Sequence, residues 1–286
     1  KCIQCAVSLT YHKGIGRMVC HYCGFSTSIP SKCGNCQSPG LSTRGFGTEK
    51  IEDEIKIIFP AARVGRMDQD TTKGKKSFDK IIRALEERQT DILIGTQMIS
   101  KGLDIENLTV VGILNADNLL NYPDFRAHER SFQLMEQVSG RAGRRQKRGK
   151  VIIQTSDPDN KIIRLVLNHD YVNMFRIQME ERRAFNYPPF CRMIKISIRH
   201  KERELLNIFS GLLARDLKKT FGKNILGPEF PLISQVQLWY IKTILIKLER
   251  ERPVATAKKI INDAIERLEK EKGGSALKIG IDVDPY

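Results

Sequence analysis

The chain has 286 residues, 41% of them hydrophobic, which is enough for two domains and a small module and excludes a disordered protein. Its formal net charge of +15 makes polyanions the natural partners. The sequence contains no apolar run of about 18 residues and no signal-peptide pattern. We therefore expect a soluble, cytoplasmic protein with no membrane partner.

Six of the seven cysteines lie in three C-x-x-C pairs near the start of the chain: Cys2/Cys5, Cys20/Cys23 and Cys33/Cys36. This spacing lets a tight turn aim two thiolates at one tetrahedral zinc. Residues 1–40 lack long apolar periodicity, so we predict a zinc-binding module there, in preference to buried free cysteines. Two pairs complete one site, so either a further pair lies upstream of Lys1 or the third pair is idle.

Three other residues bear on the metal prediction. His12 and His21 could compete as ligands, but the thiolates fill a tetrahedral site without them. Cys191 stands alone beside Pro189 and Phe190, and we interpret it as a small core residue.

The next region, residues 41–189, alternates between expected strands and helices. The strands are expected at Ala62–Met67, Asp91–Gly95, Thr109–Leu114 and Lys150–Thr155. The helices are expected at Glu49–Phe59, Lys75–Arg88, Phe125–Gly140 and, as a linker, Asn168–Ala184. Such alternation predicts an α/β lobe with a parallel sheet. The breaker Tyr187-Pro188-Pro189 ends this region.

Residues 190–286 have a different element order. We expect strands at Met193–Arg199, Ile225–Leu226, Val236–Leu248 and Leu277–Val283, and helices at Glu202–Phe221 and Pro253–Lys272. The order βαββαβ predicts a separate α+β domain of the ferredoxin-like kind.

A Gln-x-x-Gly-Arg-x-Gly-Arg segment begins at Gln137. On a helix, Gln137, Arg141 and Arg144 would share a face that presents one amide and two guanidinium groups. Gly140 weakens such a helix, which indicates a ligand that approaches the backbone closely. The alternative is a solvated basic helix end, because residues 141–150 contain six basic residues and no acid.

A second segment, Gly95–Asp104, reads Gly-Thr-Gln-Met-Ile-Ser-Lys-Gly-Leu-Asp and directly follows an expected strand. Ligands of open parallel sheets bind at the carboxyl ends of strands, which is the position of this loop. Taken alone the signal is weak, since Thr96 could equally be an ordinary turn residue.

Together these two segments resemble helicase superfamily 2, in which they form the nucleotide and DNA surfaces of the second RecA-like lobe. Further segments, in order over nearly the whole chain, resemble the PriA family of primosomal replication-restart DNA helicases. They are Cys20–Cys23, Gly45–Glu49, Arg66–Thr72, Asp124–Arg126 and Asp282–Pro285.

The resemblance implies an ATP-dependent DNA helicase of the bacterial cytoplasm that recognises stalled forks and restarts replication by primosome assembly. It implies ATP and Mg²⁺ as ligands of the full-length protein, which we expect to be a monomer. Its implied partners are forked DNA, single-stranded-DNA-binding protein and primosome proteins. It also implies two zinc ions held by four C-x-x-C pairs, with Cys2, Cys5, Cys20 and Cys23 forming a complete site and Cys33 and Cys36 a half site.

Roles follow for the two segments and for one further residue. We assign catalysis to Gln137, Arg141 and Arg144, and nucleotide binding to Gly102, Asp104 and Gly140. The residues expected to contact DNA are Thr96, Gln97, Lys101 and Arg126.

The sequence lacks one essential part of a motor. A phosphate-binding loop needs G-x-x-x-x-G-K-[ST], and the nearest string, Thr72–Ser77, does not have that spacing. We therefore interpret the chain, which opens at Lys1, as part of a longer protein and expect it not to hydrolyse ATP alone. The alternatives are a non-catalytic zinc-dependent DNA-binding module and a structural assembly platform.

Overall fold

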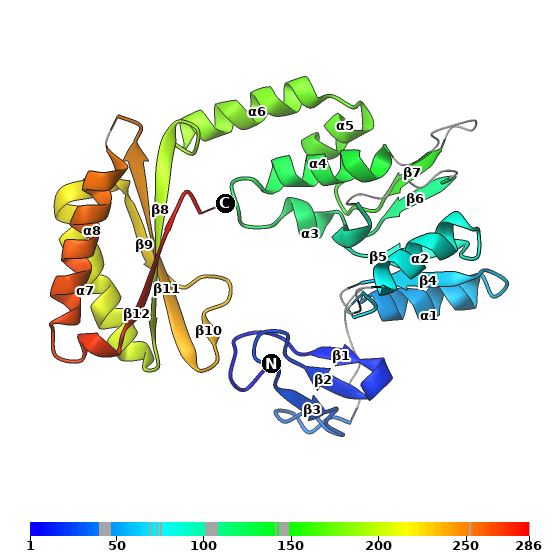
Figure 1. Cartoon of the computed structure of the whole chain (residues 1–286), viewed down its shortest axis with the longest axis horizontal. Coiled ribbons are helices and arrows are strands. Elements are labelled where there is room, and N and C mark those ends of the chain that lie inside the picture. Colours follow the sequence, from blue (N-terminus) through cyan, green and yellow to red (C-terminus); the bar gives the residue numbers. More distant parts are fainter. Residues whose placement is uncertain are drawn as a thin grey trace. The chain divides into compact units, whose positions relative to one another are not determined.

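A computed structural model describes the chain except residues 40–46, 69, 73, 75, 101–107, 141, 143–148, 252 and 286. The chain forms two compact units: Lys1–Thr43 together with Arg182–Tyr286, and Arg44–Glu181. Figure 1 labels their helices and strands. Among the described helices, none has the length and apolar character that crossing a membrane requires.

The Cys-rich module at the N-terminus contains three short strands and very little apolar core. The elements are β1 (Thr10–His12), η1 (Lys13–Ile15), β2 (Arg17–Val19) and β3 (Ser26–Ser28). The strands form an antiparallel sheet in the order β1-β2-β3. The buried residues of this module's described part are three cysteines, Cys2, Cys5 and Cys20. So small a core agrees with a module that a metal ion orders.

The C-terminal domain is an antiparallel sheet covered on one face by two helices. Its elements are β8 (Cys191–His200), α7 (Arg203–Phe221), η3 (Gly222–Asn224), β9 (Ile225–Glu229), β10 (Gln235–Val236), β11 (Trp239–Glu249), α8 (Val254–Glu269), η4 (Gly274–Ala276) and β12 (Lys278–Val283). The strand order is β10-β11-β8-β12, with β9 also paired to β11. The predicted α+β domain is confirmed, with β10 as one strand more than the predicted order βαββαβ.

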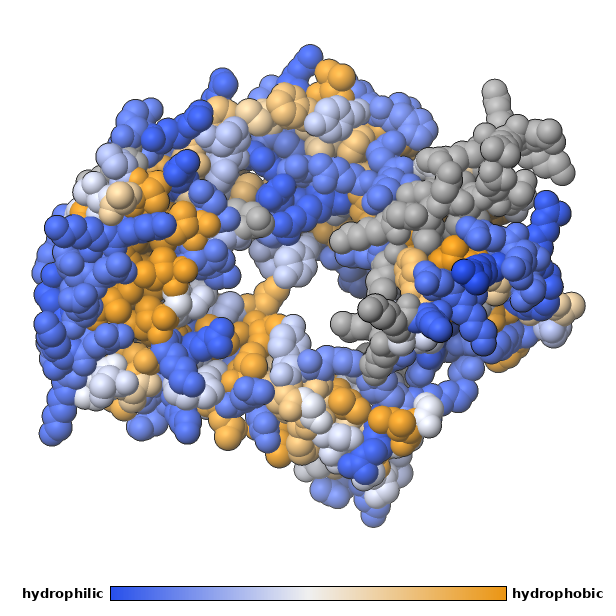
Figure 2. Space-filling model, viewed as in Figure 1, coloured by the Kyte–Doolittle hydropathy of each residue, from blue (hydrophilic) through white to orange (hydrophobic). Residues whose placement is uncertain are grey.

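Alternation along the strands explains why the helices cover a single face. Ile194, Ile196 and Ile198 of β8 are fully buried and pack in one cluster with residues of α7 and α8, which lie on the same side of the sheet (Figure 1). The outer surface of these helices, at the left edge of Figure 2, is mainly hydrophilic. α7 and α8 therefore leave the opposite sheet face uncovered, and we call it the helix-free face.

The predicted single strand Val236–Leu248 is wrong at its start, because a tight hairpin separates β10 from β11. Gln237 and Leu238 form the turn with φ of 50° and 66°. Two-residue hairpins use left-handed residues, which are usually Asn or Gly, whereas these two cost about 1–2 kcal/mol each. Because the usual turn residues are missing, no local pattern in the sequence marks this hairpin.

The second unit contains the α/β lobe. Its elements are α1 (Thr48–Ile58), β4 (Val64–Met67), α2 (Ser77–Glu86), β5 (Ile92–Gly95), η2 (Gln97–Ser100), β6 (Val110–Ile113), α3 (Asp117–Leu120), α4 (Ala127–Ser139), β7 (Lys150–Ile153), α5 (Lys161–Leu167) and α6 (Tyr171–Ala184), which runs three residues past the unit's end at Glu181. In the described residues β4 pairs with β5 and β6 with β7, both in parallel. The predicted parallel strands are confirmed.

The expected linker helix differs from the observed structure. Asn168 is the C-cap of α5, and His169 has a φ of 52°, so the chain turns before α6 begins at Tyr171. The short α3 was not predicted. Asp117 at its start accepts hydrogen bonds from the Thr155 and Ser156 hydroxyls, which fixes it to the end of β7.

Candidate functional sites

Four cysteines converge in the Cys-rich module. The sulfur atoms of Cys2, Cys5, Cys20 and Cys23 all lie within 4.8 Å of one another, and the Cys2 and Cys23 Sγ atoms are 3.5 Å apart. All four are free thiols, and the first three are buried. A tetrahedral zinc with Zn–S bonds of about 2.3 Å needs sulfurs about 3.8 Å apart. The cluster is therefore consistent with one zinc site in this chain.

The thiol pKa values of the cluster indicate that a cation is needed for all four cysteines to ionise. Burial opposes ionisation of Cys20, but backbone N–H donors from Tyr22 and Cys23 lower its pKa to about 7. For Cys23 the Phe25 N–H lowers the pKa, yet burial and the three neighbouring cysteine sulfurs outweigh it and raise the pKa to about 12. Four adjacent thiolates repel one another, so a divalent cation is what allows all of them to ionise.

The third cysteine pair lies outside this cluster. Cys33 is half-buried and Cys36 is exposed. The backbone N–H of Cys36, followed by that of Asn35, lowers the pKa of the Cys33 thiol. Among the described residues, the four-cysteine group is the one set of three or more side chains placed to hold a metal. The assignment of Cys33 and Cys36 to a half site therefore stays a prediction.

The structure places His12, His21 and Cys191 outside the four-cysteine cluster. The Nε2 atoms of His12 and His21 lie 3.3 Å apart on the surface, outside the cluster. Cys191 is buried, which raises its thiol pKa, and its Sγ donates to the Asn186 carbonyl at 3.1 Å. Cys191 is therefore a core residue of the C-terminal domain.

In the second unit, the structure brings the two sequence segments together. The turn η2, which begins at Gln97, packs against α4, which carries Gln137 in its last turn. Thr96, Gln97 and Gln137 are all exposed. Residues assigned to DNA and to catalysis therefore lie on neighbouring elements.

Glycine is required at Gly95 for a local reason. A Cβ there would overlap the Met67 carbonyl oxygen of β4 and the side chain of Ile99. At Gly140 the situation is different, because φ is −64° and a Cβ would come no closer than 3.4 Å to the Glu136 carbonyl oxygen. Nothing described within the chain demands a glycine at 140, so the prediction of a close external ligand stays a prediction.

Arg126 lies at the start of α4 and has an acidic neighbour. Its Nε is 3.7 Å from a carboxylate oxygen of Glu129, and its backbone N–H donates to Asp124. Asp124 also accepts from Arg130 at 3.0 Å. The segment is thus held by local ion pairs, and the assignment of Arg126 to DNA stays a prediction.

Five assigned residues lie outside the described part of the chain: Lys101, Gly102, Asp104, Arg141 and Arg144. Helix α4 ends at Ser139 with Gly140 as its C-cap. A helical face shared by Gln137 with the two arginines therefore stays a prediction.

The helix-free face of the C-terminal sheet carries a basic and aromatic group that sequence reasoning missed. Arg199 of β8 is paired directly with Lys278 of β12, and both are exposed. The Lys278 Nζ lies 4.3 Å from the centre of the Trp239 ring, and the Lys201 Nζ lies 5.6 Å from it. Like charges directly opposite destabilise a sheet, so this pair favours a bound anion. Because the residues are far apart in sequence, only the sheet order could reveal the group.

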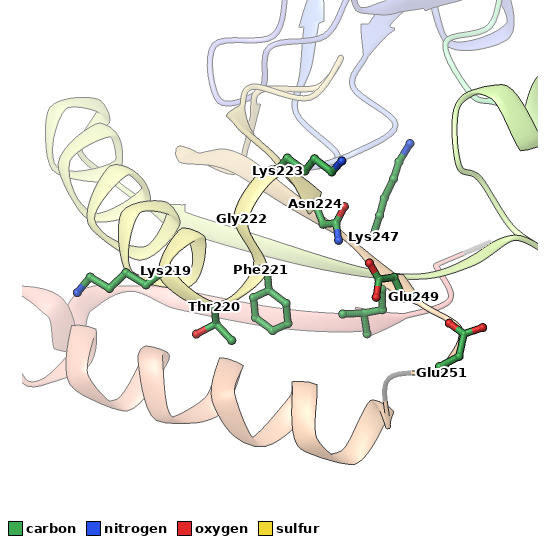
Figure 3. A pocket seen from close by; sticks show the side chains of 10 residues that line it. Lys219, Thr220, Phe221, Gly222, Lys223, Asn224, Lys247, Glu249 and Glu251 are labelled. Atoms are coloured by element: carbon green, nitrogen blue, oxygen red, sulfur yellow. The ribbon is translucent and has the colours of Figure 1, made fainter.

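A pocket of about 610 Å³ lies in the C-terminal domain where η3 meets the end of β11 (Figure 3). Three lysines and two glutamates contribute to its lining, and Lys223 and Lys247 point to the same side while Lys219 points away. The mixed charges do not suit an apolar ligand. The predicted nucleotide residues belong to the other unit, so this pocket is not a candidate nucleotide site.

Three family models match the chain in sequence order. The PriA DNA helicase Cys-rich region (CRR) domain matches residues 2–27, and the helicase conserved C-terminal domain matches residues 46–146. The primosomal protein N C-terminal domain matches residues 183–286. The parallel strands, the cysteine cluster and the α+β domain therefore define the C-terminal part of a helicase with a Cys-rich region.

Similar proteins point to one family. The chain is 40% identical to the replication restart protein PriA of Bacillus subtilis (strain 168), over 100% of this chain and 35% of that protein. It is 36% identical to the Synechocystis protein of the same name, over 100% and 34%, and 38% identical to that of Treponema pallidum, over 86% and 38%. The chain belongs to the PriA family and spans about a third of the length of these relatives.

Proposed function

We propose that this chain is the C-terminal portion of an ATP-dependent DNA helicase that recognises stalled replication forks and restarts replication by primosome assembly. The observation that carries the proposal is the alignment of the whole chain, at 40% identity, with the replication restart protein PriA of Bacillus subtilis. The partners are forked DNA, single-stranded-DNA-binding protein and primosome proteins. In the full-length protein, a further cysteine pair would complete the zinc site at Cys33 and Cys36.

In this proposal the chain supplies the second motor lobe but not the phosphate-binding loop, which its sequence lacks. A chimera tests it: these 286 residues replace the aligned portion of the Bacillus subtilis protein. We expect DNA-dependent ATP hydrolysis and fork unwinding by the chimera and none by the chain alone. A folded, zinc-loaded chimera that binds forks without hydrolysing ATP would instead support the alternative, a non-catalytic DNA-binding module.

Within that chimera, Arg141 and Arg144 are proposed to act as arginine fingers. Such a charge stabilises the transition state, in which negative charge spreads over the transferring phosphoryl oxygens. Replacing either arginine with alanine should lower kcat on the order of 10³-fold while nucleotide affinity changes much less. Steady-state ATPase assays and nucleotide titrations provide the measurement. Near-normal turnover in both variants would mean that the segment is only a basic surface.

For DNA contact by the isolated chain, we propose the helix-free sheet face around Arg199, Lys278 and Trp239, in addition to Thr96, Gln97, Lys101 and Arg126. Lys278 and Lys201 are exposed cations beside the Trp239 ring, an arrangement suited to a phosphate and an adjoining unstacked base. The chain's affinity should fall linearly with log salt, with a slope of about −0.7 to −0.9 per phosphate contacted.

Single substitutions distinguish DNA binding at this face from a general effect of removing positive charge. Arg199→Ala and Lys278→Ala should each weaken fork binding and reduce the salt slope by about 1. Lys258→Ala is the matched control, because Lys258 is an exposed lysine of α8, on the helix side of the sheet. If fluorescence anisotropy shows equal losses for all three variants, the proposed face is wrong.

A further inference from the structure

The tip of the β10–β11 hairpin contacts the four-cysteine cluster. The backbone N–H of Gln237 donates to the Sγ of Cys5 at 3.3 Å, and that of Leu238 donates to the Gln4 carbonyl at 2.8 Å. In the other direction, the Ala6 N–H donates to the Gln235 carbonyl at 2.9 Å. Three hydrogen bonds, two of them between backbone groups and one to a cysteine sulfur, thus join parts of the chain more than 200 residues apart.

Apolar packing reinforces these bonds. The side chain of Val236 packs against the cluster formed by Cys2, Cys5 and Cys20. Gln237 and Leu238 are both left-handed, at φ of 50° and 66°. Non-glycine residues stay in that region only where the surroundings determine their conformation. The contact with the Cys-rich module is the surrounding structure that does so here.

The Gln237 N–H gives Cys5 the kind of backbone hydrogen bond that the other cysteines of the cluster accept from neighbours in sequence. Cys2 accepts the N–H of Gln4, and Cys23 accepts that of Phe25, each from two residues along the chain. For Cys5 the backbone donor comes from the C-terminal domain instead. Hydrogen bonds to metal-bound thiolates offset their negative charge and fix their orientation.

We propose that the β10–β11 hairpin is part of the zinc site's outer shell, so that zinc loading clamps the C-terminal domain onto the Cys-rich module. The coupling is reciprocal: zinc orders the surface that the hairpin binds, and the hairpin slows the loss of zinc. The inference rests on zinc occupancy of the cluster and not on helicase activity, so failure of the helicase proposal would leave it standing.

A pair of substitutions at one position tests the hairpin's effect on zinc. Gln237→Pro removes the donor, and its φ near −65° cannot match the turn. Gln237→Gly keeps the N–H and accepts the positive φ without strain. Both leave the buried core of the C-terminal domain unchanged, because residue 237 is outside it.

Zinc release into a chromophoric chelator is the measurement. We expect Gln237→Pro to release zinc on the order of 10-fold faster than the native chain, and Gln237→Gly to release it no faster. A folded Gln237→Pro variant that releases zinc at the native rate would overturn the proposal. Equal acceleration by both substitutions would do so as well, since the donor would then be irrelevant.

The reverse direction is tested on the native 286-residue chain, which avoids any folding defect of a variant. Hydrogen exchange is followed by mass spectrometry with zinc bound and after chelation. Peptides that cover residues 233–239 should lose protection when zinc is removed, whereas peptides from the central strand β8 should keep theirs. Unchanged protection of residues 233–239 without zinc would contradict the clamp.

Discussion

The Cys-rich module and the C-terminal domain share one compact unit but owe their order to different forces. In the described residues, the module buries three cysteines, whereas the C-terminal domain buries eighteen residues in one cluster. Burial of that much apolar surface can stabilise a domain by itself. The small module instead needs bonds between its cysteines and a metal ion. One compact unit can therefore contain two regions that lose their structure under different treatments.

The sharpest test of this difference is Cys20→Ser. Cys20 is fully buried in the cluster, and structural zinc contributes about 10–16 kcal/mol in small zinc modules. We expect the variant to lose its zinc and the order of residues 1–39, while the C-terminal domain still unfolds cooperatively. Metal analysis and circular dichroism provide the measurement.

Cys191→Ser is the matched control, because Cys191 is equally a buried thiol but belongs to the C-terminal domain. It should retain the native zinc content, which we expect to be close to one ion per chain. Full zinc content in Cys20→Ser would show that the module does not depend on this cysteine to hold its metal.

A smaller effect is expected from shortening one core side chain of the C-terminal domain. Leu213 is 1% exposed, so Leu213→Ala should lower the free energy of unfolding by about 2–5 kcal/mol without changing the zinc content. The neighbouring Leu212 is 38% exposed, and Leu212→Ala should change it by about 0.5 kcal/mol or less. Urea unfolding followed by the fluorescence of Trp239 measures both. Similar losses for the two would show that burial does not govern this domain.

The smallest effect concerns charge. Asp216 of α7 accepts from Arg267 of α8 at 2.7 Å and from Lys219 at 3.1 Å, and these bonds, that of Arg267 first, lower the pKa of its carboxyl group. A lowered pKa stabilises the fold at pH values above the pKa of the same carboxyl group in the unfolded chain, about 3.9. This contribution is lost as the pH falls through the pKa of the folded protein.

Because Arg267 and Lys219 are exposed, Asp216→Asn should lower the free energy of unfolding at pH 7 by only about 0.2–1 kcal/mol. Urea midpoints measured at pH 7 and again below pH 3 should show the difference shrinking in acid and in high salt. A difference between the two midpoints that grows in acid would contradict this prediction.

Local patterns in the sequence were enough for much of the fold. The spacing of apolar residues predicted α7 and α8 to within a few residues, and the cysteine spacing predicted metal-binding pairs, although the choice of the two pairs that share a site came from the family resemblance. Both are properties of short stretches of chain, in which spacing alone determines which side chains share a face.

Features that depend on distant residues escaped prediction. The Gln237-Leu238 turn lacks the residues that usually mark a hairpin, because contacts with Cys5 and Gln4 hold it instead. The basic group at Arg199 and Lys278 needed the order of the sheet. No local pattern indicates which strand lies beside which, so neither feature could be read from the sequence.

The hydrogen bond between Gln237 and Cys5 cannot form until both residues have been synthesised, which takes time. The two residues are 232 positions apart, so at translation rates of about 5–20 residues per second the hairpin follows the first cysteines by roughly 12–46 s. Any metal captured by the emerging module in that time is held without the Gln237 donor. The nascent chain therefore passes through a stage in which zinc exchanges more readily than it does in the completed protein.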